Sequence, residues 1–399
     1  MRTRRLTAVT AIAATAAALL AGCSGRSGGG HGPVTADAAR PLVAVPVSTS
    51  VATAGLSWAV VPTGGPSVGG TVWQLLVRVT ADGSWRLATP PGVADNGGLV
   101  VAEAGSSAMT VGFVPNQLLR FTPLASSADD GAHWTQGLLP AGLAAAPSAL
   151  AALSGGRLLA ITSRGVQESA SGGGQWTTLV TLRTLAATAG GRACGLVALT
   201  AAAAGPSGDP LVAGECGRPG VAEVFEQTAG GWRAASARLS GSLARRPVTV
   251  LQLTPASGGT SVLLAAGRGA GEAVIPSWLA DGATTVTASA PLSIKGDPVT
   301  STFFSSSGGW GAVVGGRQAQ FDGAAAALPG TRKAVAALSS RLTSLPGKDA
   351  TLVFGPGTAA GRVLLTALIP GLDTVAVWQQ SAAGTWRRTQ VIAIPSAPS

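Results

Sequence analysis

The chain has no tyrosine and only two histidines, and each scarcity closes off a class of chemistry. Without tyrosine, no mechanism that needs a tyrosine nucleophile is available. His31 lies in a Gly-rich segment and His133 in a predicted turn, so neither is placed for a Ser-His-Asp triad. Zinc sites need three or four closely spaced His, Cys or carboxylate ligands. The sequence has no such grouping, and we expect neither a metal nor another cofactor.

Acidic residues are also few, 17 against 27 lysines and arginines, which gives a net charge of +10. Several aspartates stand in predicted turns. This leaves Glu103, Glu223 and Glu226, on predicted strands, as candidates for glycoside hydrolysis by paired carboxylates, although nothing in the sequence pairs them. The positive charges are scattered, whereas nucleic-acid-binding proteins concentrate them and interleave aromatic residues. We therefore expect no nucleic-acid partner and assign no catalytic residue.

The N-terminus follows the plan of a secretory signal. A basic start, with three arginines in the first five residues, precedes an uncharged stretch rich in Ala and Leu over 6–22. Leu20-Ala21-Gly22-Cys23 resembles the lipobox of bacterial lipoproteins, in which the cysteine becomes the first mature residue and carries a diacylglyceryl thioether. The resemblance implies lipidation at Cys23. An ordinary signal peptide, or a membrane anchor with a chance cysteine, is the alternative.

A Gly-rich polar segment, residues 24–33, follows this cysteine and indicates a flexible tether. Such a tether lets a folded domain stand clear of the lipid headgroups. We expect a signal peptide over 1–22, the lipidated cysteine and tether over 23–42, and one folded domain over 43–399. Arginine far outnumbers lysine, and Ala and Gly are abundant, as in GC-rich genomes. The expected location is the outer face of the cell membrane of a high-GC bacterium.

The two remaining cysteines form a predicted disulfide. Cys194 and Cys216 flank the predicted adjacent strands 195–203 and 210–216, and an exported chain meets an oxidising compartment. A bridge would stabilise the domain by about 3 kcal/mol in the chain-entropy model. Two unpaired buried thiols are the alternative.

Long hydrophobic runs are missing after the signal, so no mature segment is expected to span a membrane. Short apolar runs broken by Gly, Pro, Ser and Asp instead predict strands. The alternation over 71–80 and over 221–227 predicts strands buried on one face. Amphipathic helices are scarce, with short candidates only at 324–327 and 335–338.

One unit recurs through the chain: three strands, then a Gly-containing hairpin that a tryptophan often follows. The hairpins return on average about every 50 residues, a period typical of four-stranded propeller blades. They are 81–85, 129–134, 171–176, 228–232, 280–282, 321–323 and 382–386.

The repeat predicts an all-β domain, a seven-bladed β-propeller of four-stranded antiparallel blades. Each blade buries its sheet against the next, so the array needs neighbours. Six or eight blades, or two β-sandwiches, are the alternatives, and 43–51 could either begin the first blade or pair with the last. The sixth blade has the poorest last strand. The predicted blades are 43–91, 98–140, 147–184, 192–241, 247–294, 297–345 and 349–395.

Ser127-Ala128-Asp129-Asp130-Gly131-Ala132-His133-Trp134 resembles the Asp-box, Ser-x-Asp-x-Gly-x-x-Trp, of the sialidase-like (BNR-repeat) propellers. A degenerate copy begins at Ser169, with Ser171 in place of the aspartate. Enzymes of that family use a tyrosine nucleophile, which this chain lacks. The box itself is structural there, tying the hairpin amides and packing its tryptophan between sheets. The resemblance implies this role for Ser127, Asp129, Gly131, Trp134, Ser169, Gly173 and Trp176.

Segments 57–61 and 309–315 resemble the Gly-Trp-Ala-Val-Gly strand of photosystem-assembly-factor propellers. Most of the ten tryptophans stand at strand or hairpin positions expected to fill blade interfaces. Trp278 and Trp378 lie elsewhere and are candidates for stacking on a ligand.

Together these features favour a membrane-anchored extracytoplasmic lipoprotein. Its propeller, expected to be a monomeric domain, would serve as a non-catalytic binding or interaction scaffold for a protein or an envelope polymer. The alternative is a divergent glycan-active enzyme of the sialidase-like superfamily, which converging arginine and carboxylate side chains would favour. A third possibility, an assembly factor for membrane complexes, rests only on the Gly-Trp strands.

Overall fold

The computed structural model describes the chain from Thr49 to Pro395, with gaps. Cys23, the expected signal peptide and tether, and the helix candidates at 324–327 and 335–338 lie outside the described residues. The description covers 49–395 except 52–55, 65–70, 81–82, 92–97, 105–106, 115–119, 145, 147, 171, 257, 268–272, 292–298, 305–309, 315–316, 322–342, 348–349, 358–362 and 382–383.

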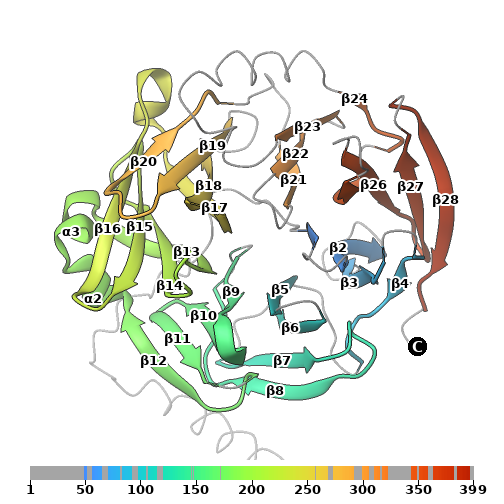
Figure 1. The fold of residues 1–399 in the computed structure, drawn as a ribbon, viewed down its shortest axis with the longest axis horizontal. Coiled ribbons are helices and arrows are strands. Elements are labelled where there is room, and N and C mark those ends of the chain that lie inside the picture. Colours follow the sequence, from blue (N-terminus) through green and yellow to red (C-terminus); the bar gives the residue numbers. More distant parts are fainter. Residues whose placement is uncertain are drawn as a thin grey trace, which may run out of the picture. The chain divides into compact units, whose positions relative to one another are not determined.

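The described strands form five four-stranded sheets and one eight-stranded sheet (Figure 1). In each four-stranded sheet, strands consecutive in sequence pair antiparallel. The first two sheets are β1 (Thr49–Val51), β2 (Ser57–Gly64), β3 (Thr71–Arg78) and β4 (Arg86–Leu87), and β5 (Leu99–Ala104), β6 (Ala108–Phe113), β7 (Thr122–Ser127) and β8 (Thr135–Leu139). The third is β9 (Leu150–Ala152), β10 (Leu158–Thr162), β11 (Gly165–Ser169) and β12 (Trp176–Thr181). The others are β21 (Val299–Phe304), β22 (Trp310–Val314), β23 (Arg317–Phe321) and β24 (Thr343–Ser344), and β25 (Thr351–Gly357), β26 (Val363–Pro370), β27 (Thr374–Gln380) and β28 (Trp386–Ala393).

The eight-stranded sheet consists of two antiparallel halves. One is β13 (Leu196–Ala204), β14 (Pro210–Cys216), β15 (Val221–Thr228) and β16 (Gly231–Arg238), and the other is β17 (Val248–Ala256), β18 (Gly259–Ala266), β19 (Ala273–Ala280) and β20 (Thr285–Ala288). The halves meet where β16 runs parallel to β20, with Ser236 opposite Thr285 and Ala237 opposite Val286. The predicted spans 192–241 and 247–294 therefore share one hydrogen-bonded sheet, because β16 and β20 come close enough to pair at two positions.

The fully described predicted hairpins lie between the third and fourth strands of their sets: 129–134 between β7 and β8, 228–232 between β15 and β16, and 280–282 between β19 and β20. β1 is the described part of the segment 43–51, and it pairs with β2, with Thr49 opposite Ala59. This segment therefore begins the first sheet. In the sixth span, the last strand β24 has only two residues. The repeat read from the hairpins thus agrees with the strand order.

The prediction of half-buried strands was wrong. In β3, Leu75, Leu76 and Val77 are all 0% exposed, and Leu76 packs into a different hydrophobic core from its two neighbours. β15 behaves alike, since Val224 and Phe225 belong to separate cores. Alternate side chains of one strand point to opposite faces of its sheet. Both faces are covered here because another sheet packs on each.

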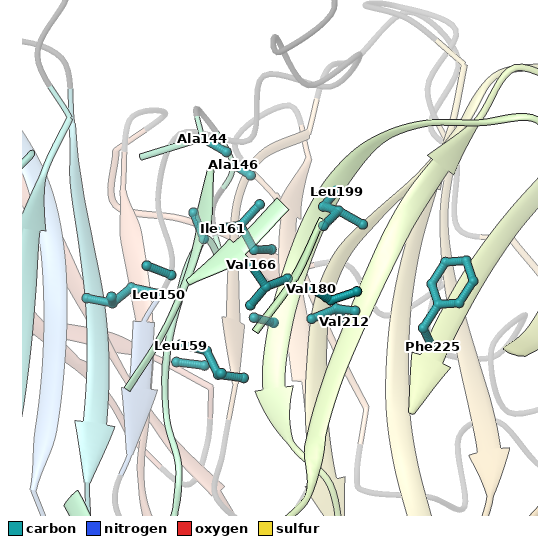
Figure 2. Packing of buried hydrophobic residues seen from close by; sticks show 14 of the residues in the cluster. Ala144, Ala146, Leu150, Leu159, Ile161, Val166, Val180, Leu199, Val212 and Phe225 are labelled. Atoms are coloured by element: carbon teal, nitrogen blue, oxygen red, sulfur yellow. The ribbon is translucent and has the colours of Figure 1, made fainter. Parts of the chain in front are cut away.

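The largest core of the described residues packs the β9–β12 sheet against the β13–β16 half-sheet and also includes Leu124 and Leu139 of the β5–β8 sheet (Figure 2). Leu159 and Ile161 of β10 pack in the same cluster as Leu199 of β13 and Val212 of β14. Aliphatic side chains dominate this cluster, and burying them supplies most of the favourable free energy of packing.

Neighbouring sheets contact each other through their first strands. β5 contacts β9, β9 contacts β13, and β13 contacts β17, while β25 of the last sheet contacts β1 and β2 of the first. Polar side chains add links between hairpins. Arg86 donates to the carbonyl oxygens of Asp130 (2.6 Å) and Gly131 (3.4 Å), and Arg233 donates to the carbonyl of Gly282 at 3.0 Å. Each arginine stands just after a hairpin tryptophan and holds a later hairpin.

Two short helices, α2 (Leu182–Ala186) and α3 (Ala189–Cys194), were not predicted. Each begins after a threonine whose hydroxyl accepts a backbone N–H, Thr181 from Thr184 and Thr188 from Gly191. Threonine is a favoured N-cap, so this was the available signal. Two 3₁₀ segments, η2 (Ser154–Gly156) and η3 (Gly241–Arg245), complete the helical structure of the described residues. Among these helices none has the length and apolar character needed to cross a bilayer.

Candidate functional site

The hairpin between β7 and β8 is organised around Ser127 and Asp129. The Ser127 hydroxyl accepts the backbone N–H groups of Gly131 (2.9 Å) and Asp129 (3.2 Å), and donates to Asp129 Oδ1 at 2.8 Å. The Trp134 ring lies over Gly131, where a Cβ atom would come 3.0 Å from it. Gly131 has a φ of 78°, which favours glycine. Contacts among these four residues hold the chain in a single turn.

The Asp129 carboxylate also contacts His133 at two points. Its Oδ1 accepts the His133 backbone N–H at 2.9 Å, and its Oδ2 lies 2.6 Å from Nδ1 of the ring. The hydrogen bonds from His133, and then that from Ser127, lower the pKa of Asp129 well below its usual range. The imidazole is solvent-exposed, with 90% of the side chain accessible. Histidine and aspartate therefore stabilise the turn together.

The segment 169–176, which the sequence suggested as a degenerate copy, lies between β11 and β12. Ser169 is fully buried at the end of β11 and pairs with Trp176 across the ladder. Gly173 has a φ of 89°, and Trp176 is half-buried against the largest core. Ser171 lies outside the described residues. Gly173 thus lies in the connection between β11 and β12, and Trp176 begins β12.

The predicted disulfide is confirmed. Cys194, the last residue of α3, is bonded to Cys216, the last residue of β14, with their Cα atoms 5.1 Å apart. β13 and β14 pair antiparallel beside it, as the sequence predicted. The bond fixes α3 to one end of the sheet.

Glu223 of β15 is buried beneath α3, an arrangement that the sequence did not predict. Ser236 of β16 donates to both of its carboxylate oxygens, at 3.0 and 2.9 Å. Burial raises the pKa of Glu223, while the Ser236 hydrogen bond and the charge of Arg238 oppose the rise. A Cβ at Gly190 of α3 would lie 2.8 Å from Glu223 Oε1, so the Gly-Gly pair in α3 was the signal for this close approach.

Glu223 and the two sulfur atoms lie within 4.8 Å of one another, the kind of cluster that can hold a metal ion. Metal-binding cysteines bind as thiolates, however. Sulfur atoms joined in a disulfide are not thiolates, so in the oxidised protein Glu223 would be the only strong ligand of this cluster.

Glu103 of β5 pairs with Trp58 of the neighbouring sheet. The Trp58 indole N–H donates to Glu103 Oε2 at 2.9 Å. Burial raises the pKa of Glu103 to about 7, and the hydrogen bond from Trp58 limits the rise. A carboxyl group with this pKa can hold or release a proton near neutral pH. No period in the sequence links residues 58 and 103, so the pair was missed.

The three glutamates that the sequence offered for catalysis are not brought together. Glu103 belongs to the β5–β8 sheet, and Glu223 and Glu226 to β15. Glu226 forms an ion pair with Arg233 on the adjacent strand. Each of these carboxylates has a hydrogen-bond or ion-pair partner from the fold.

The two tryptophans proposed as stacking platforms are packed into the fold. Trp278 of β19 is 8% exposed and covers Gly259, where a Cβ would lie 2.6 Å from the indole ring. Trp378 of β27 is half-buried against the core of the last sheet. Trp278 thus presents no free face to a ligand.

Neither a protein-family model nor a curated protein sequence matches the chain. Solved structures do. The chain is similar to the periplasmic gluconolactonase PpgL of Pseudomonas aeruginosa, with 12% identity and a TM-score of 0.52 over 85% of this chain and 97% of that one. It is also similar to YCF48 from Cyanidioschyzon merolae (15%, 0.45, 86% and 94%) and to the fucose-recognising lectin of Aleuria aurantia (12%, 0.40, 88% and 96%). These structures are β-propellers. The fold is a β-propeller.

The propeller explains the burial seen above. Successive sheets pack face to face, so interior strands such as β3 and β15 are covered on both sides. At these identities the similarity shows the fold and leaves activity open.

Proposed function

We propose that this chain is an extracytoplasmic lipoprotein, lipidated at Cys23, whose seven-bladed propeller is a non-catalytic interaction scaffold for a protein or an envelope polymer. The proposal has three parts, which are the blade count, the anchor and the scaffold role. Each has its own support and its own test.

The blade count is supported by the grouping of the described strands into sets of four. Five sets are separate sheets, and the eight-stranded sheet counts as two blades because only two residue pairs join β16 to β20. An experimental structure tests the count. Six or eight four-stranded blades around the axis would overturn it.

The anchor is supported by the basic start, the apolar stretch and the four residues that end at Cys23. Mass spectrometry of the protein isolated from cell membranes should find an N-terminal cysteine carrying a diacylglyceryl group. The full chain with Cys23→Ser should leave the detergent phase and keep an unmodified N-terminus. A native protein whose first residue precedes Cys23, without lipid, would refute the anchor.

The scaffold role is carried by how the described acidic and histidine side chains are used. Asp129 and His133 build a turn, Glu103 binds Trp58, Glu223 binds Ser236, and Glu226 and Glu168 pair with Arg233 and Arg157. Groups that serve the fold in this way favour a binding surface over a reaction centre. A glycan array and a screen for co-purifying proteins test the role, and saturable binding without turnover is the expected result.

A divergent glycan-active enzyme is the second candidate, and Glu103 is the observation that favours it. A raised pKa is what a general acid needs to be protonated near neutral pH. A panel of fluorogenic glycosides tests this candidate. Turnover by the wild-type chain that disappears in Glu103→Gln, while a Glu168→Gln control keeps it, would replace the scaffold role.

A further inference from the structure

Five exposed arginines stand on segments at the same end of the β9–β12 and β13–β16 sets of strands. We call this group the arginine end. It comprises one arginine from the β10–β11 turn, one each from α2 and α3, one from the β14–β15 turn and one from η3. They are Arg164, Arg183, Arg192, Arg218 and Arg245.

The topology brings these segments together. In an antiparallel four-stranded blade, the start of the first strand, the turn between the second and third strands and the end of the fourth lie at one end. Backbone hydrogen bonds join the segments directly: Leu182 N–H donates to Arg164 O at 2.8 Å, and Arg218 N–H to Cys194 O at 3.3 Å. η3 is tied in the same way, since Gly220 N–H donates to Arg246 O at 2.7 Å.

The backbone segments of the arginine end are also linked covalently and by packing. The Cys194–Cys216 disulfide joins α3 to β14 within it, and α2 contacts α3. Charges on backbone segments that are tied to one another need less ordering on binding than the same charges on a loose segment.

The segments that carry these arginines contain no acidic residue: 163–164, 182–195, 217–220 and 239–247 have neither Asp nor Glu. The nearest carboxylates in sequence are those of Glu215, which is half-buried, and Glu223, which is buried against Ser236. Like charges held together without acidic residues among them repel one another. Such a cost is expected where the surface serves a binding role.

An aliphatic side chain accompanies the charges. Val197 is 45% exposed, and a Cβ at Gly217, next to Arg218, would lie 3.5 Å from it. Guanidinium groups bind phosphate oxygens in pairs of hydrogen bonds, and basic residues around exposed aliphatic groups are typical of surfaces that rest on lipid headgroups.

We propose that the arginine end is a docking surface for the anionic phospholipid headgroups of a membrane. The charges come from two blades and two helices, which suits a plane of phosphates better than one small anion. No aromatic residue stands among them in the four segments, which disfavours a single-stranded nucleic acid. The proposal rests on the proposed anchor only for keeping the domain near the membrane. It adds that the propeller lies on the membrane by this end.

Vesicle sedimentation tests the proposal with the full chain carrying Cys23→Ser, so that no acyl group contributes. Vesicles of phosphatidylcholine alone are compared with vesicles that also contain phosphatidylglycerol. We expect binding that requires phosphatidylglycerol and weakens with added salt. Arg183→Gln with Arg218→Gln should lower it by about tenfold or more, because each basic residue near an anionic surface adds to the affinity.

Arg387→Gln with Arg388→Gln is the matched control, since it removes the same charge from exposed positions of β28. It should change binding by less than about threefold. Equal losses in the two double variants, or binding that does not depend on phosphatidylglycerol, would overturn the proposal. So would polyphosphate that binds more tightly than the vesicles, because the ligand would then be a soluble polyanion. Retention of the disulfide and an unchanged unfolding midpoint show that the variants are folded.

This result is separate from the fate of the anchor. The Cys23→Ser chain carries no lipid, so headgroup binding can fail while mass spectrometry still finds lipidated Cys23. Conversely, the arginine end can bind headgroups even if Cys23 is never lipidated.

Discussion

The side-chain amide of Gln390 in β28 makes two hydrogen bonds to the backbone of Trp85. Its Oε1 accepts the Trp85 N–H at 3.0 Å, and its Nε2 donates to the Trp85 carbonyl at 2.7 Å. One amide thus satisfies both backbone groups of a residue 305 positions away in sequence. Arg78, over the Trp85 ring at 5.2 Å, also reaches Thr366 of the last sheet. The first and last sheets of the propeller are therefore held together around Trp85.

Gln390→Ala should therefore destabilise the propeller. It removes two partly buried hydrogen bonds and leaves the Trp85 backbone groups unpaired, which costs about 1–3 kcal/mol in the free energy of unfolding. Urea unfolding followed by tryptophan fluorescence measures the loss. Gln136→Ala is the control, because Gln136 is exposed on β8 and should change stability by less than about 0.5 kcal/mol. Equal midpoints for the two variants would mean that the contact between first and last sheets adds nothing.

Ser127→Ala tests the turn between β7 and β8. The hydroxyl accepts two backbone N–H groups, and that of Gly131 is buried, so its loss should lower the free energy of unfolding by about 1–3 kcal/mol. Asp129→Asn should also destabilise, and its effect should fade in acid. The pKa of Asp129 is lowered in the folded state, so its contribution is present above the ordinary carboxyl pKa and is lost as the pH falls through the folded value.

Exposed Ser242 provides the comparison for this turn, and Ser242→Ala should match the wild type. Thermal melts at neutral and acidic pH measure both effects. If Ser127→Ala melts with the wild type, the turn is organised by something other than this hydroxyl.

The repeated hairpins and the strand order could be predicted from the sequence, whereas the contacts between sheets could not. Hairpin glycines, turn aspartates and trailing tryptophans are fixed by backbone geometry, so they recur at the blade period and predict strand order. Cys194 and Cys216 could be paired for the same reason, since they flank neighbouring strands. What covers a strand is decided by another sheet. The alternation in 71–80 therefore predicted half burial, whereas the real β3 is buried on both faces.

The same limit applies to the sites. Trp58 and Glu103 meet across two sheets, and the arginine end collects side chains from 164 to 245. Neither grouping has a spacing that a single sequence displays, because the chain segments meet only after the blades pack. α2 and α3 were missed for a different reason. Each is about one and a half turns long and has no amphipathic period. The threonine N-caps were therefore the signal in the sequence that could have predicted them.

Removing the disulfide should loosen one end of the β13–β16 half-sheet. Cys194→Ser with Cys216→Ser should lower the free energy of unfolding by about 2–4 kcal/mol, because the unfolded chain regains the freedom that the bridge removes. Urea titrations with and without dithiothreitol measure the change. The reductant should lower the midpoint of the wild-type chain and leave the double variant unchanged. Cys23→Ser should behave as the wild type. A reductant-insensitive midpoint in all three proteins would mean that the bridge is not formed in solution.

Glu103 should make stability fall as the pH rises through neutrality. Its pKa is raised from 4.5 to about 7 in the folded protein, so the folded state binds the proton more tightly than the unfolded state does. The contribution of the protonated carboxyl is complete below about pH 4.5 and is lost as the pH approaches and passes 7. The loss is on the order of 2–3 kcal/mol.

In Glu103→Gln, the amide oxygen can still accept from Trp58 but cannot ionise, so this pH dependence should disappear. At pH 8 the variant should have a higher free energy of unfolding than the wild type. Glu168→Gln, which removes the partner of Arg157, should keep the slope. Urea unfolding between pH 4.5 and 8 decides the matter, and a slope that survives in Glu103→Gln would assign it to another group.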